Sequence, residues 1–214
     1  MNAPLTESSV KRLVLPTPFP VGPVNAFLIR RDPLTLVDTG PMTEEAYGRL
    51  VAQLREHGVD LADLEVILIT HGHQDHMGLL GRLLEASEAE AYAHPLVVHR
   101  TRDFEQSHRD NLDFHITVMR ELGVPEPILV AQKALQKEVV AYGAPAVIRH
   151  TAEDGGEAAG FSTYHVPGHS PSDTLFVDHE ARLAFLGDHV LKSINPNPLL
   201  RRPTPGEARP KSLV

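Results

Sequence analysis

Residues 67–78, which read ILITHGHQDHMG, decide the fold of this chain. A run of apolar β-forming residues leads into three histidines and an aspartate, and a leucine-rich segment follows directly. Such a cluster has no use in a packed core, because buried imidazoles and carboxylates need partners. The stretch therefore indicates a buried strand, a loop that carries chemical groups, and a helix.

The composition is that of an ordinary globular protein, and it excludes several classes of protein. The 214 residues, of which 42% are hydrophobic and 22% charged, can form one substantial core, so we expect one domain over residues 1–214. The net charge of −8 argues against a large nucleic-acid surface, because phosphate binding needs densely placed basic residues. The chain has no cysteine and 13 histidines, so a transition-metal site must use histidine and carboxylate ligands.

The sequence shows no feature that would place the chain in a membrane or export it. No segment approaches the ~20 apolar residues that span a bilayer. The N-terminus also lacks an apolar stretch behind a basic start. We therefore expect a cytoplasmic protein with no membrane contact.

The first half of the chain has the pattern of strands that alternate with amphipathic helices. A helix is predicted over 42–60, where Ala46, Leu50 and Leu54 repeat with helical spacing. The leucines of residues 76–90 predict a second helix. Apolar runs flanked by Pro, Gly and Asp predict strands at 11–16, 25–30, 34–40, 65–70 and 90–94.

The second half changes from strands to helices and back. Helical spacing predicts an insertion of about residues 95–145 that contains helices over 103–124 and 127–143. Strands are expected at 160–170 and over 173–188, the latter as a hairpin. The proline-rich residues 193–214 have no period and predict a loop or tail.

The histidine loop presents four candidate ligands from the end of one strand. His71 and His73 lie two residues apart, so in an extended segment their side chains leave the backbone on the same side. Gly72 between them permits a sharp turn, and Asp75 and His76 follow where the loop enters the helix. A loop cluster of this kind can supply ligands to two neighbouring metal ions.

Three more polar residues stand at the carboxyl ends of predicted strands, namely Asp38, His169 and Asp188. Functional side chains of layered α/β proteins converge at such strand ends, although a single His or Asp after a strand is more often a turn or capping residue. His189 adjoins Asp188, and its role is left open. The other histidines are interpreted as surface or locally hydrogen-bonded residues: His57, His94, His99, His108, His115, His150, His165 and His179.

Four short motifs follow one another along the chain: VDTG (37–40), THGHQDHMG (70–78), PGHS (167–170) and LGDH (186–189). Together they resemble the successive motifs of the metallo-β-lactamase-fold hydrolase superfamily. The resemblance implies an α/β fold, a four-layer αββα sandwich that carries the helical insertion, with a two-metal site at one edge of the sheets.

The resemblance also implies a role for each candidate residue. The first metal would be bound by three histidines. The second would be bound by a carboxylate and a histidine, with another carboxylate bridging the two metals and a further aspartate orienting the ligands. His71, His73 and His169 would bind the first metal, and Asp75 and His76 would bind the second. Asp188 would bridge the two metals, and Asp38 would orient the ligands.

The chain departs from this pattern near its C-terminus. Two-metal members of the superfamily supply a further histidine to the second site from a late strand, whereas this sequence has no histidine after His189. The resemblance therefore implies that the C-terminal part of the fold, a last strand and helix, is truncated and that the second metal site is incomplete.

The ligand chemistry and the resemblance predict a metal-dependent hydrolase. Residues 167–177 and the insertion resemble the glyoxalase II-like and β-lactamase-like hydrolases of the superfamily. A bound cation generates hydroxide near neutral pH, which would cleave an ester, thioester or similar small substrate, with Asp75 orienting the hydroxide or accepting its proton. We expect one or two zinc ions, with iron or manganese as alternatives.

Other functions fit the same residues. A ribonuclease of the β-lactamase-like group would use two metals on a phosphodiester, and RNA would then replace the small-molecule substrate. A mononuclear iron held by His71, His73 and Asp188 would instead oxidise a persulfide, or the chain would be an impaired metal-binding fragment. A homodimer is compatible with each of these functions.

Overall fold

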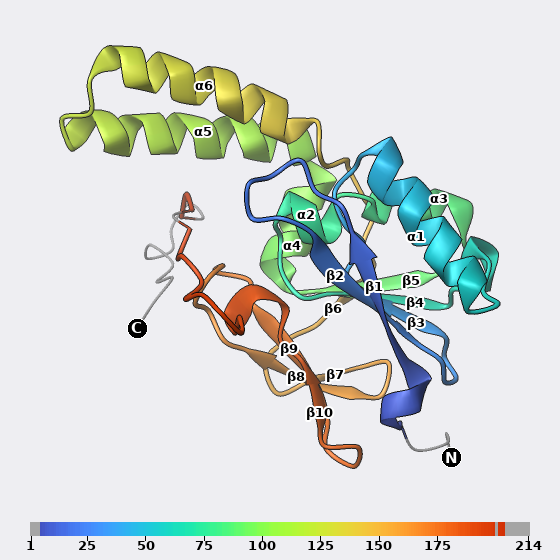
Figure 1. The fold of residues 1–214 in the computed structure, drawn as a ribbon. Helices are drawn as coiled ribbons and strands as arrows, with labels where there is room; N and C mark the ends of the chain where they lie inside the picture. Colours follow the sequence, from blue (N-terminus) through green and yellow to red (C-terminus); the bar gives the residue numbers. More distant parts are fainter. Residues whose placement is uncertain (1–4, 200, 204–214) are drawn as a thin grey trace.

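The computed structural model describes residues 5–199 and 201–203 of the chain, whose strands form two sheets (Figure 1). The first sheet has six strands in the order β1-β2-β3-β4-β5-β6. β1, β2 and β3 pair antiparallel, and the strands from β3 to β6 pair parallel. Their bounds are β1 Val10–Leu15, β2 Val24–Ile29, β3 Thr35–Val37, β4 Val66–Ile69, β5 Glu90–Ala93 and β6 His150–Thr151.

The second sheet has four antiparallel strands in the order β10-β9-β8-β7. They are β7 Glu157–Ala158, β8 Phe161–His165, β9 Thr174–Asp178 and β10 Leu183–Phe185. The predicted strands over 160–170 and 173–188 are therefore present, the latter as the β9–β10 hairpin. β6 and β7 were not predicted, because two residues are too few to show a strand period.

The helices are α1 Glu44–Glu56, α2 Gln74–Met77, α3 Leu80–Ala86, α4 Pro95–Arg102, α5 Phe104–Glu121 and α6 Glu126–Val140, with 3-10 turns η1 Glu7–Ser9, η2 Leu61–Asp63 and η3 Gly187–His189. α1 begins where the Thr43 side chain accepts a hydrogen bond from the backbone N–H of Ala46, a common N-terminal cap. Its apolar face is buried through Ala46, Leu50 and Leu54, as the helical spacing predicts.

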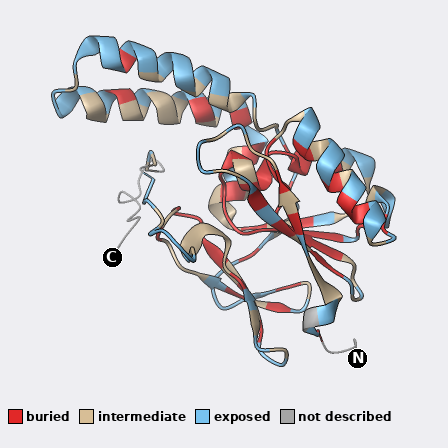
Figure 2. Ribbon diagram, viewed as in Figure 1, coloured by how far each residue is buried: buried red, intermediate tan, exposed pale blue. Residues whose placement is uncertain are grey.

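The sequence of β4 is apolar at every position because both faces of this strand are buried. Successive side chains of a strand point to opposite faces. Ile67 and Ile69 pack in the core that also contains the apolar residues of α1 and α3, whereas Val66 and Leu68 pack with Phe161 and other residues of the second sheet. Both faces of β4 are therefore covered, and its four residues are all buried (Figure 2).

Two cores thus separate three layers, which are the helices α1 and α3, the six-stranded sheet and the four-stranded sheet. These layers correspond to the first three of the expected αββα sandwich. In the part of the chain that the structure describes, no α-helix follows α6, so the outer face of the second sheet carries no helical layer there.

The segment between β5 and β6 contains α4, α5 and α6, and the last two form a helical hairpin that projects beyond the sheets (Figure 1). The helices predicted over 103–124 and 127–143 are confirmed as α5 and α6. α4 was not predicted as a separate helix.

The helix predicted over 76–90 is confirmed in part: α3 lies within this range, but the helix is shorter than predicted and α2 is separate from it. Gly78 ends α2 at a close approach of three backbone segments. A Cβ atom on Gly78 would lie 2.3 Å from the Tyr142 carbonyl oxygen and 2.6 Å from the backbone nitrogen of Met42. The helical hydrogen bonding is interrupted at Leu79, whose backbone N–H donates to the Gly40 carbonyl oxygen at 3.1 Å, a tertiary contact that leucine spacing does not reveal.

The expected tail lies partly outside the described residues, which exclude 200 and 204–214. Its described part, 193–199 and 201–203, has neither helix nor strand, as predicted. Among the described helices, none has the length and apolar character needed to cross a membrane.

Candidate metal centre

The candidate ligands meet at one edge of the two sheets, where their strands end. Asp38 directly follows β3, and the histidine loop follows β4. From the second sheet come His169, in the loop between β8 and β9, and Asp188, in the η3 turn after β10. Residues far apart in the sequence are thereby brought together, as their positions at strand ends predicted.

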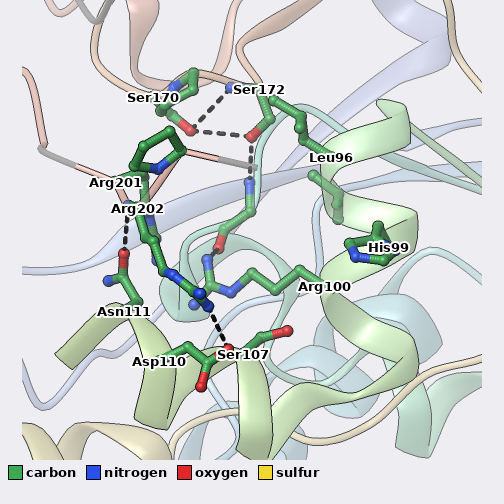
Figure 3. A pocket seen from close by; sticks show the side chains of 14 residues that line it. Leu96, His99, Arg100, Ser107, Asp110, Asn111, Ser170, Ser172, Arg201 and Arg202 are labelled. Atoms are coloured by element: carbon green, nitrogen blue, oxygen red, sulfur yellow. Dashed lines mark hydrogen bonds and ion pairs between the residues drawn. The ribbon is translucent and has the colours of Figure 1, made fainter. Parts of the chain in front are cut away.

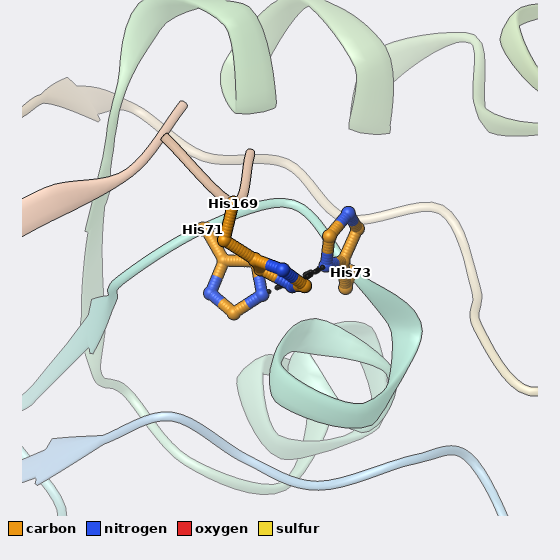
Figure 4. Close-up of side chains that lie close together, drawn as sticks. All are labelled: His71, His73 and His169. Carbon is orange, nitrogen blue, oxygen red and sulfur yellow. Dashed lines mark hydrogen bonds between the residues drawn. The ribbon is translucent and has the colours of Figure 1, made fainter. Parts of the chain in front are cut away.

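Three imidazoles form a first cluster from His71, His73 and His169 (Figure 4). Nδ1 of His73 lies 2.9 Å from Nε2 of His71 and 2.9 Å from Nε2 of His169. His71 and His73 are buried, and His169 is partly buried. The three rings thus direct one nitrogen each toward a common point.

The hydrogen bonds behind these rings determine their tautomers. Nδ1 of His169 lies 2.7 Å from the carbonyl oxygen of Asn197, which can only accept, so Nδ1 carries the hydrogen. The Thr70 hydroxyl donates to Asp38 and therefore accepts from Nδ1 of His71 at 3.1 Å. Nε2 of both His71 and His169 is consequently an unprotonated nitrogen with a lone pair directed into the cluster.

Whether hydrogen bonds can satisfy these lone pairs decides whether the cluster suits a metal ion. Nδ1 of His73 carries at most one hydrogen, which cannot satisfy the lone pairs of both His71 and His169. A cation satisfies all three nitrogens at once, and imidazole nitrogen is a preferred ligand of zinc, copper, iron and nickel. The residues present therefore fit a transition-metal ion.

A second cluster consists of His71, His76 and Asp188. Nε2 of His76 lies 3.4 Å from Oδ1 of Asp188 and 4.0 Å from Oδ2 of Asp75. Oδ2 of Asp188 lies 3.8 Å from Nε2 of His169. Asp188, a member of the second cluster, therefore also lies near the first cluster.

Asp38 supports both clusters from behind. Its buried carboxylate accepts hydrogen bonds from the Thr70 backbone N–H at 2.9 Å, the Thr70 hydroxyl at 2.8 Å and Nδ1 of His76 at 2.8 Å. The Thr70 hydroxyl in turn orients His71. Carboxylates commonly orient metal-binding histidines in this way, and the arrangement agrees with the supporting role expected for Asp38.

Family comparison agrees with this geometry. A model of the metallo-β-lactamase superfamily matches residues 19–210, which is most of the chain. The chain belongs to the metallo-β-lactamase superfamily. Members of this superfamily bind metal ions, and this chain has the two histidine and aspartate clusters described above.

Individual relatives support the assignment. The chain is 31% identical over 217 residues to a probable metallo-hydrolase, YqjP, of Bacillus subtilis (strain 168), covering 98% of this chain and 66% of that protein. It is 27% identical over 157 residues to hydroxyacylglutathione hydrolase GloC of Haemophilus influenzae, covering 72% of this chain and 59% of GloC.

Among solved structures, a metallo-β-lactamase family protein from Thermus thermophilus matches with a TM-score of 0.73 and 27% identity, over 91% of this chain and 64% of that one. This match confirms the metallo-β-lactamase fold expected from the motifs. The chain spans at most about two thirds of the length of each of these three relatives.

The charge states of the histidines differ between the two clusters of this superfamily member. Burial, reinforced by neighbouring positive groups, lowers the pKa of His71 and of His73 well below the usual value, so both rings are neutral and keep a lone pair for a metal. Burial alone would lower the pKa of His76 too, but Asp38 and Asp188 raise it well above its usual value. A proton on Nδ1 of His76 faces Asp38 and one on Nε2 faces Asp188, and a cation beside Nε2 would take the place of the second proton.

The two carboxylates near His76 are shifted in opposite directions. Burial raises the pKa of Asp75 above its usual value, and the charge of Asp188 adds to this effect. Burial would also raise the pKa of Asp188, but the hydrogen bond and charge of His76 lower it below the usual value. Asp188 therefore keeps its negative charge to a lower pH than Asp75 does, and Asp75 is the more basic carboxylate.

A cavity of ≈550 Å³ opens beside these residues, and His73, Asp75, His169 and Asp188 form part of its wall. The opposite wall comes from α5 and α6, through residues that include Leu112, Gln132, Gln136, Lys137 and Val140. This size is typical of a small-molecule site.

Several of the remaining histidines have local partners outside the two clusters. Nδ1 of His189 lies 3.5 Å from Oδ2 of Asp173, and neither residue belongs to the two clusters. His94 stacks on His165 with ring centroids 4.0 Å apart. Sequence reasoning missed Arg100 of α4, which donates a hydrogen bond to the Gly72 carbonyl between His71 and His73, because an arginine in an amphipathic helix gives no signal of such a role.

Proposed function

We propose that this protein is a metal-dependent hydrolase that cleaves an ester, a thioester or a similar small substrate, with zinc as its metal. The observation that carries the proposal is the convergence of three imidazole nitrogens, from His71, His73 and His169, beside Asp75 and Asp188. The adjoining cavity offers room for a small molecule. The names of two relatives, a probable metallo-hydrolase and a hydroxyacylglutathione hydrolase, support the same reaction class.

The candidate ligands would have different roles. His71, His73 and His169 would hold one metal ion, and His76 with Asp75 would hold a second that Asp188 shares. Bound divalent cations lower the pKa of a coordinated water and polarise the bond under attack. Asp75 lines the cavity, and burial raises its pKa, so its carboxylate is suited to orient the attacking water and to accept its proton.

The hydrogen bonds behind the ligands contribute by keeping the site rigid. Asp38 and Thr70 fix the rings of His76 and His71, and the Asn197 carbonyl fixes His169. A ligand that is already oriented loses less conformational freedom when the metal binds. The chain would therefore present a preformed site to its substrate.

Elemental analysis of the purified protein, combined with assays on S-acyl thioesters and on RNA, tests the proposal. We expect bound zinc, thioester or ester hydrolysis that is lost on chelation and restored by zinc, and intact RNA. His169→Ala should lower both metal content and hydrolysis, whereas His179→Ala, which changes an exposed histidine, should lower neither. One iron per chain without hydrolysis, or RNA cleavage without thioester turnover, would overturn the proposal.

A further inference from the structure

Arg100 occupies an unusual position beside the first metal cluster. Its Nη1 donates to the carbonyl oxygen of Gly72, and its Nη2 lies 2.8 Å from Nε2 of His108. Its Nε is buried and has no hydrogen-bond partner among the described residues. The guanidinium therefore contacts the loop that carries His71 and His73 while part of its hydrogen-bonding capacity remains unused.

The partners of Arg100 do not neutralise its charge. Nε2 of His108 accepts from Arg100, and the side-chain amide of Gln74 lies 2.9 Å from the same atom. Burial, together with the charges of Arg100 and Arg201, lowers the pKa of His108 to about 3, so this ring is neutral. The Gly72 carbonyl is neutral as well, and a buried charge without an opposite charge is costly.

Arg201 lies close to Arg100. Within the described residues, the arginines that form ion pairs with carboxylates are Arg31, Arg49, Arg55, Arg82, Arg109, Arg120 and Arg202. Neither Arg100 nor Arg201 is among them. Burial lowers the pKa of Arg201 to about 10, and the proximity of Arg201 adds to the effect of burial in lowering that of Arg100. Both guanidiniums would thus gain from an anion.

Both arginines line a cavity of ≈180 Å³ whose wall also includes Gly72, Ser170 and Ser172 (Figure 3). The acidic side chain in this wall, Asp110, is neutralised by its ion pair with Arg202. Arg201 and Asn111 line this cavity and also the larger cavity at the metal centre. The two cavities are therefore neighbours.

Ser170 and Ser172 provide a further hydrogen-bond donor. Their hydroxyl oxygens lie 2.9 Å apart, so one hydroxyl hydrogen lies between them. Each oxygen also accepts one backbone N–H: Gly72 donates to Ser172, and Ser172 donates to Ser170. Whichever serine donates to its neighbour, the second hydroxyl hydrogen of the pair has no acceptor among the described residues.

We propose that Arg100 and Arg201, with the serine pair, form an anion subsite that binds a carboxylate or phosphate group at the end of the substrate away from the scissile bond. This inference rests on the proposed hydrolytic function, because it places the reacting bond in the cavity at the metal centre. Planar, charge-assisted contacts from arginine suit both kinds of anion. The substrate class is thus an ester or thioester that carries a remote negative charge.

The test uses three S-phenyl thioesters that share one short acyl chain and differ at its far end, which is a carboxylate, a phosphonate or a neutral carboxamide. With the zinc-loaded protein, we expect kcat/KM to be higher for an anionic thioester than for the carboxamide. Arg100→Met and Arg201→Met should each lower kcat/KM for that anion by about 10- to 100-fold, as expected for the loss of a hydrogen bond to a charged group. Any loss on the carboxamide should be smaller than on the anion, so the ratio of the two kcat/KM values falls, and the preferred anion shows whether the natural group is a carboxylate or a phosphate.

Arg102→Met is the matched control, because it removes the same charge from an exposed position on the same helix, α4. The subsite would be overturned if Arg102→Met lost as much kcat/KM for the anionic thioester as the other two variants. It would also be overturned if Arg100→Met and Arg201→Met lost equal kcat/KM on the anionic and the neutral thioesters. If Arg100→Met does not fold, Arg201→Met decides the question alone.

A binding measurement separates this proposal from the proposed function. Calorimetric titration with glutarate and with inorganic phosphate should show binding that Arg201→Met weakens and Arg102→Met does not. That result would support the subsite even if none of the thioesters were hydrolysed. Binding that is unchanged in Arg201→Met would reflect anion contact with the metal alone, and the subsite would be rejected.

Discussion

Oδ2 of Asp38 lies 2.8 Å from Nδ1 of His76, and the same oxygen accepts the Thr70 hydroxyl that orients His71. One buried carboxylate therefore determines the ring orientation of a histidine in each cluster. Because Asp38 is itself outside both clusters, its influence on a metal would act entirely through its hydrogen-bond partners.

Replacing Asp38 with Asn should weaken metal binding. The amide would place an N–H group against the donors of Thr70 or His76, which leaves a buried donor without an acceptor. We expect metal affinity to fall by about 10- to 100-fold, the usual effect of changing a residue that supports a metal ligand, as measured by competition with a chromophoric chelator. Asp113→Asn, at an exposed position on α5, is the control. Unchanged affinity in Asp38→Asn would show that the rings are held without this carboxylate.

Gly187 lies against Thr70 of the same hydrogen-bond network, where there is no room for a side chain. Its φ is +51°, and a Cβ would lie 2.5 Å from Oγ1 of Thr70. Gly187→Ala should lower the free energy of unfolding by about 2 to 4 kcal/mol, since it combines backbone strain with overpacking. Gly58→Ala isolates the strain, because Gly58 also has a positive φ, +70°, but nothing lies within 4 Å of its added Cβ. Equal losses in urea denaturation would mean that Thr70 moves aside freely.

Asp188 should matter for both metal content and turnover. A carboxylate between two cations reduces their mutual repulsion, and Asp188 lies near both His76 and His169. Asp188→Ala should therefore reduce the metal bound per chain and the rate of hydrolysis together, as determined by elemental analysis and a thioester assay. The matched replacement Asp113→Ala should reduce neither. If both variants keep their metal, Asp188 is not a bridge.

Much of this architecture follows from local sequence patterns. The four apolar residues of β4 and the buried face of α1 show their periods directly, and the histidine loop lies at a strand end because Ile69 is followed at once by polar residues. These features depend on neighbours within a few residues, which is the range over which hydrophobic periodicity carries information. The cluster of residues 71–76 was identified from the same local pattern, whereas His169 and Asp188 were assigned as ligands through the resemblance carried by the order of the four motifs.

Other features depend on contacts between distant segments. The separation of α2 from α3 accompanies the hydrogen bond from the Leu79 backbone N–H to the Gly40 carbonyl oxygen, and the position of Arg100 results from the packing of α4 against the histidine loop. Neither contact can be predicted from the spacing of apolar residues in the sequence. The same holds for β6 and β7, which exist because neighbouring strands pair with them.

His94 should make the stability of the protein dependent on pH. Its Nδ1 accepts a hydrogen bond from the backbone N–H of Leu96 at the start of α4. Burial, with a contribution from His165, lowers its pKa to about 4. Between the usual histidine pKa of ~6.5 and about 4, the unfolded chain takes up a proton that the folded protein does not. The free energy of unfolding should therefore fall as the pH decreases through this range.

His94→Asn tests this dependence, because asparagine can also cap a helix but does not titrate. Thermal melts of the two proteins between pH 7 and pH 4 should diverge, with the wild type losing more stability toward acid. Parallel curves would show that protonation of His94 is not coupled to folding.

The two metal positions should differ in affinity. The first cluster offers three imidazole nitrogens, of which those of His71 and His169 are held by hydrogen bonds as unprotonated ligands. Among the described residues, the second position offers His76 and Asp75 as its own ligands, whereas Asp188 and His71 also lie near the first position. Asp75 is also the carboxylate whose pKa burial raises, so it binds a cation less readily than Asp188. We therefore expect one metal to be held tightly and the other weakly.

Stepwise titration with a chelator, with bound metal counted at each step, measures this difference. The second metal should leave first, and hydrolytic activity should fall with it while the first metal remains. His76→Ala should remove only the weak binding step, whereas His169→Ala should weaken the tight one. Two metals that leave together with equal affinity would mean that a further group completes the second position, and that His76, Asp75 and Asp188 are not its full set of ligands.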